Sequence, residues 1–155
     1  MRELTRSELR LLDAMQKDTT LSQIDLAELS GKSRTSVWRW IREIEEAGVI
    51  ESKVALLNPK ELGLNIQVLL SVTMARHSKQ TRREFEDHVQ TLPEVMECYS
   101  VSGGRDYVLL ILSRDMEAYN DFLNNRILDH PSVHSASSSF ALRRVKYTTA
   151  LPLQE

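Results

Sequence analysis

Residues Ser22–Gly48 read SQIDLAELSGKSRTSVWRWIREIEEAG, and this stretch decides the fold of the N-terminal part of the chain. Ser22 is a favourable N-cap for one helix, and Gly31 favours the left-handed conformation that commonly ends a helix. Ser33 is the N-cap of a second predicted helix, which Gly48 closes. Because only a short glycine-containing turn remains between the two helices, the stretch predicts a helix-turn-helix motif.

The second helix of this motif is apolar on one side and polar on the other. Val37, Ile41 and Ile44 recur at positions i, i+4 and i+7 and are expected to face the core. Residues 29–42 hold four basic side chains and no acidic one, which predicts a local positive patch. Such a helix can lie in the major groove of duplex DNA, where arginine binds guanine edges or phosphates. The candidate DNA-binding residues are Ser33, Arg34, Thr35, Ser36, Trp38, Arg39 and Arg42.

Two features of the same helix qualify this interpretation. A run of basic residues is also typical of a solvated helix face, so the charge pattern alone leaves both interpretations open. Trp38 and Trp40 flank Arg39, and aromatic residues at helical spacing usually pack against other elements. We therefore expect Trp40 to lie in the core and Trp38 at the edge of the DNA-binding surface.

The residues on either side of the motif complete an N-terminal domain. Thr5 and Glu8 have the spacing of a capping box, which predicts a first helix. After the motif, Val49–Leu57 has the pattern of a strand or wing, and Asn58-Pro59 interrupts it. We assign residues 1–57 to a helix-turn-helix DNA-binding domain and residues 58–65 to a hinge.

The remaining residues alternate between strand and helix patterns. Ile66–Met74 alternates apolar and polar residues, which predicts a strand with one buried side. Tyr107–Leu112 is almost continuously apolar, as in a buried central strand, and Gly103-Gly104 supplies the turn before it. The expected elements are strand 66–74, a helix around Phe85 and Val89, strand 95–102, strand 107–112, helix 116–127 and strand 133–145. This βαββαβ order indicates a ferredoxin-like domain over residues 66–155, so the fold class is α+β, with an N-terminal winged helix-turn-helix domain.

The composition of the chain excludes several classes of protein. Its 155 residues carry 20 Lys and Arg against 22 Asp and Glu, a net charge of −2, so the whole chain is not a basic nucleic-acid binder. The N-terminal residues are charged throughout, and no segment approaches about 20 apolar residues. We therefore expect no signal peptide, no membrane partner and a cytoplasmic location.

Enzyme and metal chemistry find little support among the residues. The one cysteine, Cys98, permits neither an internal disulfide nor a cysteine zinc cluster, and it is expected in the core. His130 and His134 are four residues apart, but Pro131 denies them a shared helix face, so we expect no metal site. No catalytic or cofactor-binding motif is present, so we expect no enzyme activity and no cofactor.

Several blocks of sequence together resemble one family. They are Leu26-Ala27 with Ser33 and Arg39, Glu45–Ile50, Leu57-Asn58-Pro59 with Leu62-Gly63-Leu64, Gly103-Gly104 before Asp106-Tyr107, and Ser138–Leu142. In their order and spacing the chain resembles the Lrp/AsnC family of bacterial and archaeal transcription regulators. The closing Lys146–Leu153 is similar to the branch that includes leucine-responsive and branched-chain regulators. Trp40 departs from the family pattern, in which a basic residue is common at this position.

The resemblance implies a homodimer built from back-to-back sheets of the C-terminal domains, with dimers assembling into octamers or similar rings. It also implies a small effector, in this family usually an amino acid, bound between dimers near the loop that joins the second and third strands. The implied effector-binding residues are Val101, Gly103, Gly104, Arg105, Asp106, Tyr107, Ser137, Ser138 and Ser139. In this loop Asp106 can accept from an α-ammonium group and Arg105 can pair with a carboxylate. A plain hairpin turn also explains Gly103-Gly104 from local sequence alone.

We therefore expect a sequence-specific DNA-binding transcriptional regulator whose assembly and binding to promoter DNA respond to the effector. Two alternatives remain open from the residues. One is a ferredoxin-like ligand-binding or assembly module that does not bind DNA, and the other is a small enzyme acting on an amino acid. Duplex binding that weakens steeply with salt favours the regulator, whereas turnover of an amino acid favours the enzyme.

Overall fold

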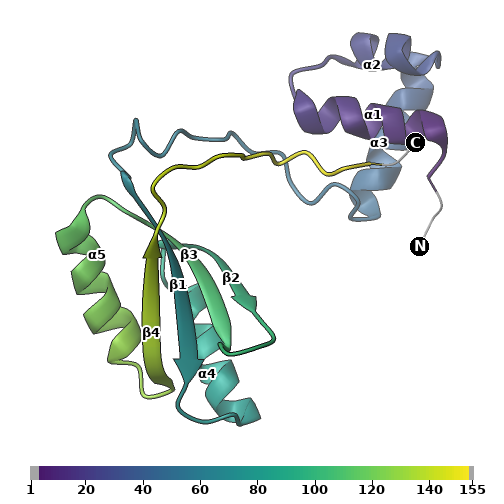
Figure 1. Cartoon of the computed structure of the whole chain (residues 1–155). Coiled ribbons are helices and arrows are strands. Elements are labelled where there is room, and N and C mark those ends of the chain that lie inside the picture. The colour runs from purple at the N-terminus through teal and green to yellow at the C-terminus, as the bar shows by residue number, and fades with distance from the viewer. Residues whose placement is uncertain (1–3, 154–155) are drawn as a thin grey trace. The chain divides into compact units, whose positions relative to one another are not determined.

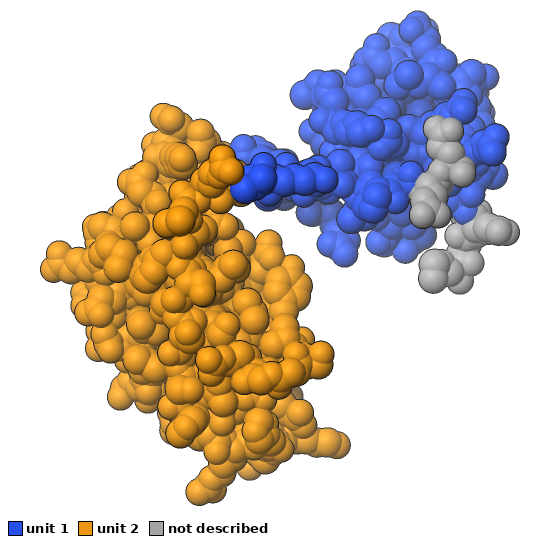
Figure 2. Space-filling model, in the orientation of Figure 1, with its two compact units in different colours: residues 1–56, 145–155 blue, residues 57–144 orange. Residues whose placement is uncertain are grey.

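The computed structural model describes residues 4–153, which form two compact units (Figure 1, Figure 2). Unit 1 contains residues 4–56 and 145–153, and unit 2 contains residues 57–144. The sequence analysis assigned residues 66–155 to one C-terminal domain. In the structure, contacts group residues 145–153 with the N-terminal helices and not with the sheet that precedes them.

Unit 1 contains the three helices α1 (Arg6–Lys17), α2 (Gln23–Ser30) and α3 (Arg34–Glu46). Side-chain caps determine where they begin. Thr5 Oγ1 accepts from the Glu8 N–H at 3.4 Å, and Glu8 Oε2 accepts from the Thr5 N–H at 2.8 Å. Ser22 begins α2 with the same reciprocal arrangement, and Gly31 ends it with φ 65°, a value that favours glycine. The predicted helix-turn-helix motif is confirmed.

The three helices enclose a small apolar core. Its buried members are Leu11, Leu26, Val37, Trp40 and Ile44. Trp40 is only 5% exposed and Trp38 is 47% exposed, which confirms the core position expected for Trp40. Within the described residues, the Trp40 indole N–H has no hydrogen-bond partner. Trp40 therefore contributes by packing, and its side chain is not available to hold a phosphate.

A single glutamine anchors the C-terminal segment of unit 1. Gln16 Nε2 in α1 donates to the Leu151 carbonyl at 3.0 Å, and Gln16 Oε1 accepts from the Leu151 N–H at 2.8 Å. One side-chain amide thus satisfies both backbone groups of one residue, as a neighbouring strand would. This pairing holds a segment that has neither helix nor strand of its own against α1.

Residues 49–57 were interpreted as a strand or wing; they form no strand, so the strand interpretation is wrong. The segment leaves α3 through Gly48, with φ 69°, and then runs without regular structure. Val54, Leu56 and Leu57 are 67%, 61% and 71% exposed. A strand needs a partner for its backbone N–H and C=O groups, and none of the described residues supplies a strand beside this segment. The apolar side chains whose pattern suggested a strand therefore remain exposed in a single chain.

Unit 2 is a four-stranded antiparallel sheet with helices on one side (Figure 1). Its elements are β1 (Ile66–Met74), α4 (Lys79–Gln90), β2 (Val95–Ser100), β3 (Tyr107–Ser113), α5 (Met116–Phe122), the π-helical turn η1 (Leu123–Leu128) and β4 (Val133–Phe140). The strands lie in the order β2-β3-β1-β4, which confirms the ferredoxin-like βαββαβ arrangement.

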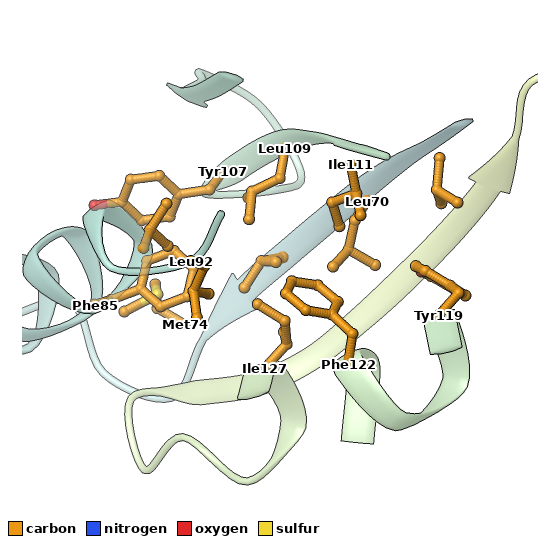
Figure 3. Close-up of a cluster of buried hydrophobic side chains, with 13 residues drawn as sticks. Leu70, Met74, Phe85, Leu92, Tyr107, Leu109, Ile111, Tyr119, Phe122 and Ile127 are labelled. Carbon is orange, nitrogen blue, oxygen red and sulfur yellow. The ribbon is translucent and has the colours of Figure 1, made fainter. Parts of the chain in front are cut away.

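The helix-covered face of the sheet carries the larger core (Figure 3). Alternate residues of β1 and β3 point into it, and Leu70, Leu109 and Ile111 have no exposed surface. Phe85 of α4 and Phe122 of α5 pack against them. This alternation, with a period of two residues, determines which side chains can reach the opposite face.

Three elements differ in length from the prediction. β4 ends at Phe140 and not at residue 145, since its last pairing is with Val68, two residues from the start of β1 at Ile66. β2 ends at Ser100, where its pairing with Tyr107 is the last of the ladder. The expected helix over 116–127 is α5 followed by the wider turn η1.

Among residues 4–153, no helix covers the second face of the sheet. Leu69 of β1 is paired with Leu110 of β3, and Tyr99 of β2 is paired with Val108 of β3. Leu69 is 46% exposed and Tyr99 is 58% exposed, so apolar side chains lie uncovered across three neighbouring strands. Among the described residues, no helix is long and apolar enough to cross a lipid bilayer.

Candidate DNA-binding and effector sites

The N-terminal end of α3 uses two of its candidate residues for its own capping. Ser33 Oγ accepts from the Ser36 N–H at 3.2 Å, and the two hydroxyls lie 2.9 Å apart. Arg34 and Thr35 are exposed beside this cap. The first turn of α3 therefore presents one cation and small hydroxyl groups to solvent, and Ser33 also has a structural role.

The two arginines further along α3 are exposed, and each lies near a glutamate of the same helix. Arg42 Nη2 lies 2.9 Å from Glu46 Oε1, and the Arg42 guanidinium carbon lies 5.2 Å from the centre of the Trp38 ring. Arg39 Nε lies 3.8 Å from Glu43 Oε1. Both glutamates follow the basic stretch at residues 29–42. Their i, i+4 spacing was the signal that would have found them.

Asp106 holds the loop between β2 and β3 against the end of β1. Its Oδ2 accepts from the Met74 N–H at 2.8 Å, and its backbone N–H donates to the Val72 carbonyl at 3.0 Å. Its Oδ1 lies 3.2 Å from His77 Nδ1. The side chain of Asp106 is 24% exposed. The carboxylate proposed for an α-ammonium group thus already serves the protein's own backbone.

The other loop residues are more accessible. Arg105 Nη1 donates to Thr73 Oγ1 at 3.3 Å, and Gly103 has φ 114°, which an L side chain rarely adopts. Gly104 is exposed, and Val101 is 36% exposed. Four candidate effector residues therefore share one exposed loop with Asp106 at its base.

Tyr107 does not join them, since its side chain points the other way. It is 2% exposed and lies 5.0 Å, centre to centre, from the Phe85 ring in the core. Its hydroxyl donates to Glu86 Oε1 at 2.6 Å. Burial, with help from this glutamate, raises the pKa of Tyr107. The alternation of buried residues along β3 would have predicted this orientation, whereas Glu86 lies on another element and was missed.

The three candidate serines of β4, Ser137, Ser138 and Ser139, do not form one group. Ser138 is paired with Leu70 on the helix-covered face, and its hydroxyl is hydrogen-bonded to Tyr119. Ser137 and Ser139 are exposed and lie on the uncovered face. Of the three candidates, Ser137 and Ser139 can present hydroxyls to a molecule on that face, and Ser138 cannot.

Cys98 lies on the helix-covered side of β2, opposite Leu109. It is half-buried, and burial together with the nearby Glu86 raises the pKa of the Cys98 thiol to about 11. In residues 4–153, no group of three or more His, Cys, Asp or Glu side chains is arranged to hold a metal ion.

Comparisons with known proteins agree with both units. The sequence matches a winged helix-turn-helix DNA-binding domain over residues 4–51 and the Lrp/AsnC ligand binding domain over residues 67–151. It is 32% identical to the DNA-binding transcriptional activator DecR of Escherichia coli, over 97% of this chain and 99% of that protein. It is 35% identical to the Bkd operon transcriptional regulator of Pseudomonas aeruginosa, over 99% of this chain and 100% of that protein.

Solved structures give the same result. A transcriptional regulator from Neisseria meningitidis in complex with L-Met superimposes with a TM-score of 0.92 at 32% identity, covering 97% of both chains. An AsnC family regulator from Agrobacterium tumefaciens superimposes with a TM-score of 0.90 at 38% identity, covering 96% of this chain and 97% of that one. These findings confirm the resemblance and the fold class expected from the sequence. The chain belongs to the Lrp/AsnC family of DNA-binding transcriptional regulators.

Proposed function

We propose that this regulator binds promoter DNA through the exposed side of α3 and that an amino acid bound to unit 2 changes this binding. The observation that carries the first part is the division of α3 into two sides. Val37 and Ile44 are buried, whereas the Arg39 side chain is 75% exposed and the Arg42 side chain 57% exposed. A helix with this division can face a groove without disturbing its own core.

The DNA-binding role is tested with Arg39→Ala. Duplexes are first selected from a random pool with the unaltered protein, and their affinity is then measured by fluorescence anisotropy. We expect Arg39→Ala to weaken binding to the selected duplex by about 1–3 kcal/mol. Arg83→Ala is the matched control. Arg83 Nε lies 3.9 Å from Asp87 Oδ2, much as Arg39 Nε lies 3.8 Å from Glu43 Oε1, but Arg83 is on α4 of unit 2. Equal affinities of the two variants would contradict the assignment.

We also propose that two copies pair through the uncovered face of the sheet. Exposed apolar side chains across several strands are typical of a surface that another subunit covers. Leu69→Lys is expected to convert dimers to monomers in sedimentation experiments, because it places a charge within this face. Leu62 is 59% exposed in the turn before β1, so Leu62→Lys is the control and is expected to leave the dimer intact. We propose further that these dimers assemble into octamers or similar rings.

The β2–β3 loop is the proposed effector site, with Val101, Gly103, Gly104 and Arg105 exposed and Asp106 holding the loop. The L-Met bound to the Neisseria meningitidis regulator supports an amino acid as the effector class. A thermal-shift screen of the twenty amino acids identifies the ligand. Arg105→Gln is then expected to weaken its binding, whereas Arg114→Gln, beyond the opposite end of β3, is expected to leave it unchanged. We also propose that this DNA-binding regulator acts in the cytoplasm.

A further inference from the structure

Trp38, Arg42 and Glu46 form a continuous row along the exposed side of α3, each four residues after the last. The Arg42 guanidinium carbon lies 5.2 Å from the centre of the Trp38 ring, and Arg42 Nη2 donates to Glu46 Oε1 at 2.9 Å. Trp38 is 47% exposed, and the side chains of Arg42 and Glu46 are 57% and 67% exposed. The row is therefore accessible along its whole length, and its central cation has a partner on each side.

We propose that this row contributes to sequence specificity. Trp38 and Glu46 position Arg42 to contact a base edge, and they make its contacts with phosphates less favourable. The inference rests on the proposed function of α3. The role of Glu46 is the new part of this proposal, because Glu46 contacts Arg42 and need not contact DNA itself. It is a positioning residue, and Trp38 is its counterpart on the other side of Arg42.

The physical argument begins with the shape of the guanidinium group. A planar guanidinium binds guanine O6 and N7 through two parallel N–H donors, and this contact requires a defined orientation of the plane. A tryptophan ring beside it stabilises one orientation through the cation–π interaction. The carboxylate of Glu46 occupies one edge of the guanidinium and leaves other N–H donors for a base. Arg42 therefore loses less conformational entropy when it binds a base.

The carboxylate has a second effect, which depends on the DNA. Phosphate oxygens attract any arginine whatever the sequence, and these contacts dominate non-specific binding. Glu46 competes with a phosphate for the same N–H donors, so contacts to random DNA must displace it. A base contact that uses the remaining donors does not require this displacement. Glu46 therefore weakens binding to random duplexes more than binding to a selected duplex.

The test compares Glu46→Gln with Glu45→Gln. Both changes remove one negative charge near the end of α3, but Glu45 Oε1 pairs with Lys53 Nζ at 2.6 Å and not with Arg42. Affinity for the selected duplex and for a random duplex is measured over a series of salt concentrations. For Glu46→Gln we expect random-duplex affinity to rise about twofold and its logarithmic salt slope to steepen by about 0.9. The affinity ratio of selected to random duplex is expected to fall, and Glu45→Gln is expected to leave the slope unchanged.

Two outcomes overturn the proposal. Equal changes in Glu45→Gln and Glu46→Gln would assign the effect to net charge, and an unchanged slope in Glu46→Gln would show that Glu46 does not compete with phosphate. Trp38→Phe retains an aromatic face and is expected to keep the specificity ratio, whereas Trp38→Leu is expected to lower it. An equal loss in both tryptophan variants would refute the role of the ring. Wild-type protein that binds no duplex would refute the proposed function itself, a result distinct from all of these.

Discussion

Asp106 offers the sharpest test of how unit 2 is built, because its carboxylate has defined partners. In Asp106→Ala, the Met74 N–H loses an acceptor 2.8 Å away at the end of β1. A hydrogen bond to a charged group contributes about 1.5–3 kcal/mol, and a buried donor left without an acceptor costs a similar amount. The His77 pair adds little, because that side chain is 69% exposed. We expect the free energy of unfolding of unit 2 to fall by about 1.5–3 kcal/mol.

The chain allows the two units to be followed separately. Both tryptophans, Trp38 and Trp40, lie in unit 1, so their fluorescence reports on that unit, whereas far-ultraviolet circular dichroism reports on both. In urea, Asp106→Ala is expected to lower the unfolding midpoint of unit 2 by about 1 M if m is near 2 kcal/mol per M. The tryptophan signal is expected to keep its wild-type midpoint.

Asp106→Asn is the matched variant, because it retains a side-chain oxygen that can accept from the Met74 N–H. It is expected to recover most of the lost stability. A wild-type midpoint for unit 2 in Asp106→Ala would refute the structural role. If Asp106→Ala kept the wild-type midpoint but failed to bind the effector, the carboxylate would instead be assigned to direct contact with the ligand.

Three further predictions concern other parts of the chain. Because the pKa of Cys98 is raised to about 11, its thiol stays protonated at pH 8, and alkylation is expected to be about 100-fold slower than for a thiol of pKa 9. The rate is expected to rise about tenfold per pH unit toward pH 11, and a rate that levels off below pH 9 would contradict this. Gln16→Ala removes both hydrogen bonds to Leu151, so hydrogen exchange of the Leu151 amide is expected to accelerate at least severalfold by NMR; unchanged exchange would show that another group protects it. Ser22→Ala is expected to destabilise unit 1 by about 1 kcal/mol, and Ser22→Gly by only a few tenths, when tryptophan fluorescence is followed in urea; equal losses would refute the capping role.

The features that the sequence predicted well are those with local causes. Thr5 and Ser22 begin helices because each side chain satisfies backbone donors within its own first turn. The strands of unit 2 followed from alternation that one buried face imposes on consecutive residues. The resemblance to one family added the order of these elements, which short-range patterns alone do not determine.

The features that were missed depend on residues far apart in the chain. β4 ends near the start of its partner β1, and the segment over 49–57 stays irregular because no strand of the described residues pairs with it. Tyr107 was grouped with the loop before it, although its position at the start of β3 directs its side chain into the core. Glu46 follows the basic run at residues 29–42 and pairs with its last arginine, Arg42. In each case the structure depends on a neighbouring residue or strand, which the local sequence does not identify.

The anchoring of residues 145–153 on α1 has a consequence for the order of biosynthesis. A ribosome releases α1, α2 and α3 first, then every strand of unit 2, and only afterwards Leu151, the residue that Gln16 holds. Unit 2 can therefore fold while unit 1 still lacks part of its surface. A nascent chain stalled before residue 145 would carry a complete sheet and a DNA-binding unit that still lacks Leu151, so unit 1 can take its final form only after every strand of unit 2 has been synthesised.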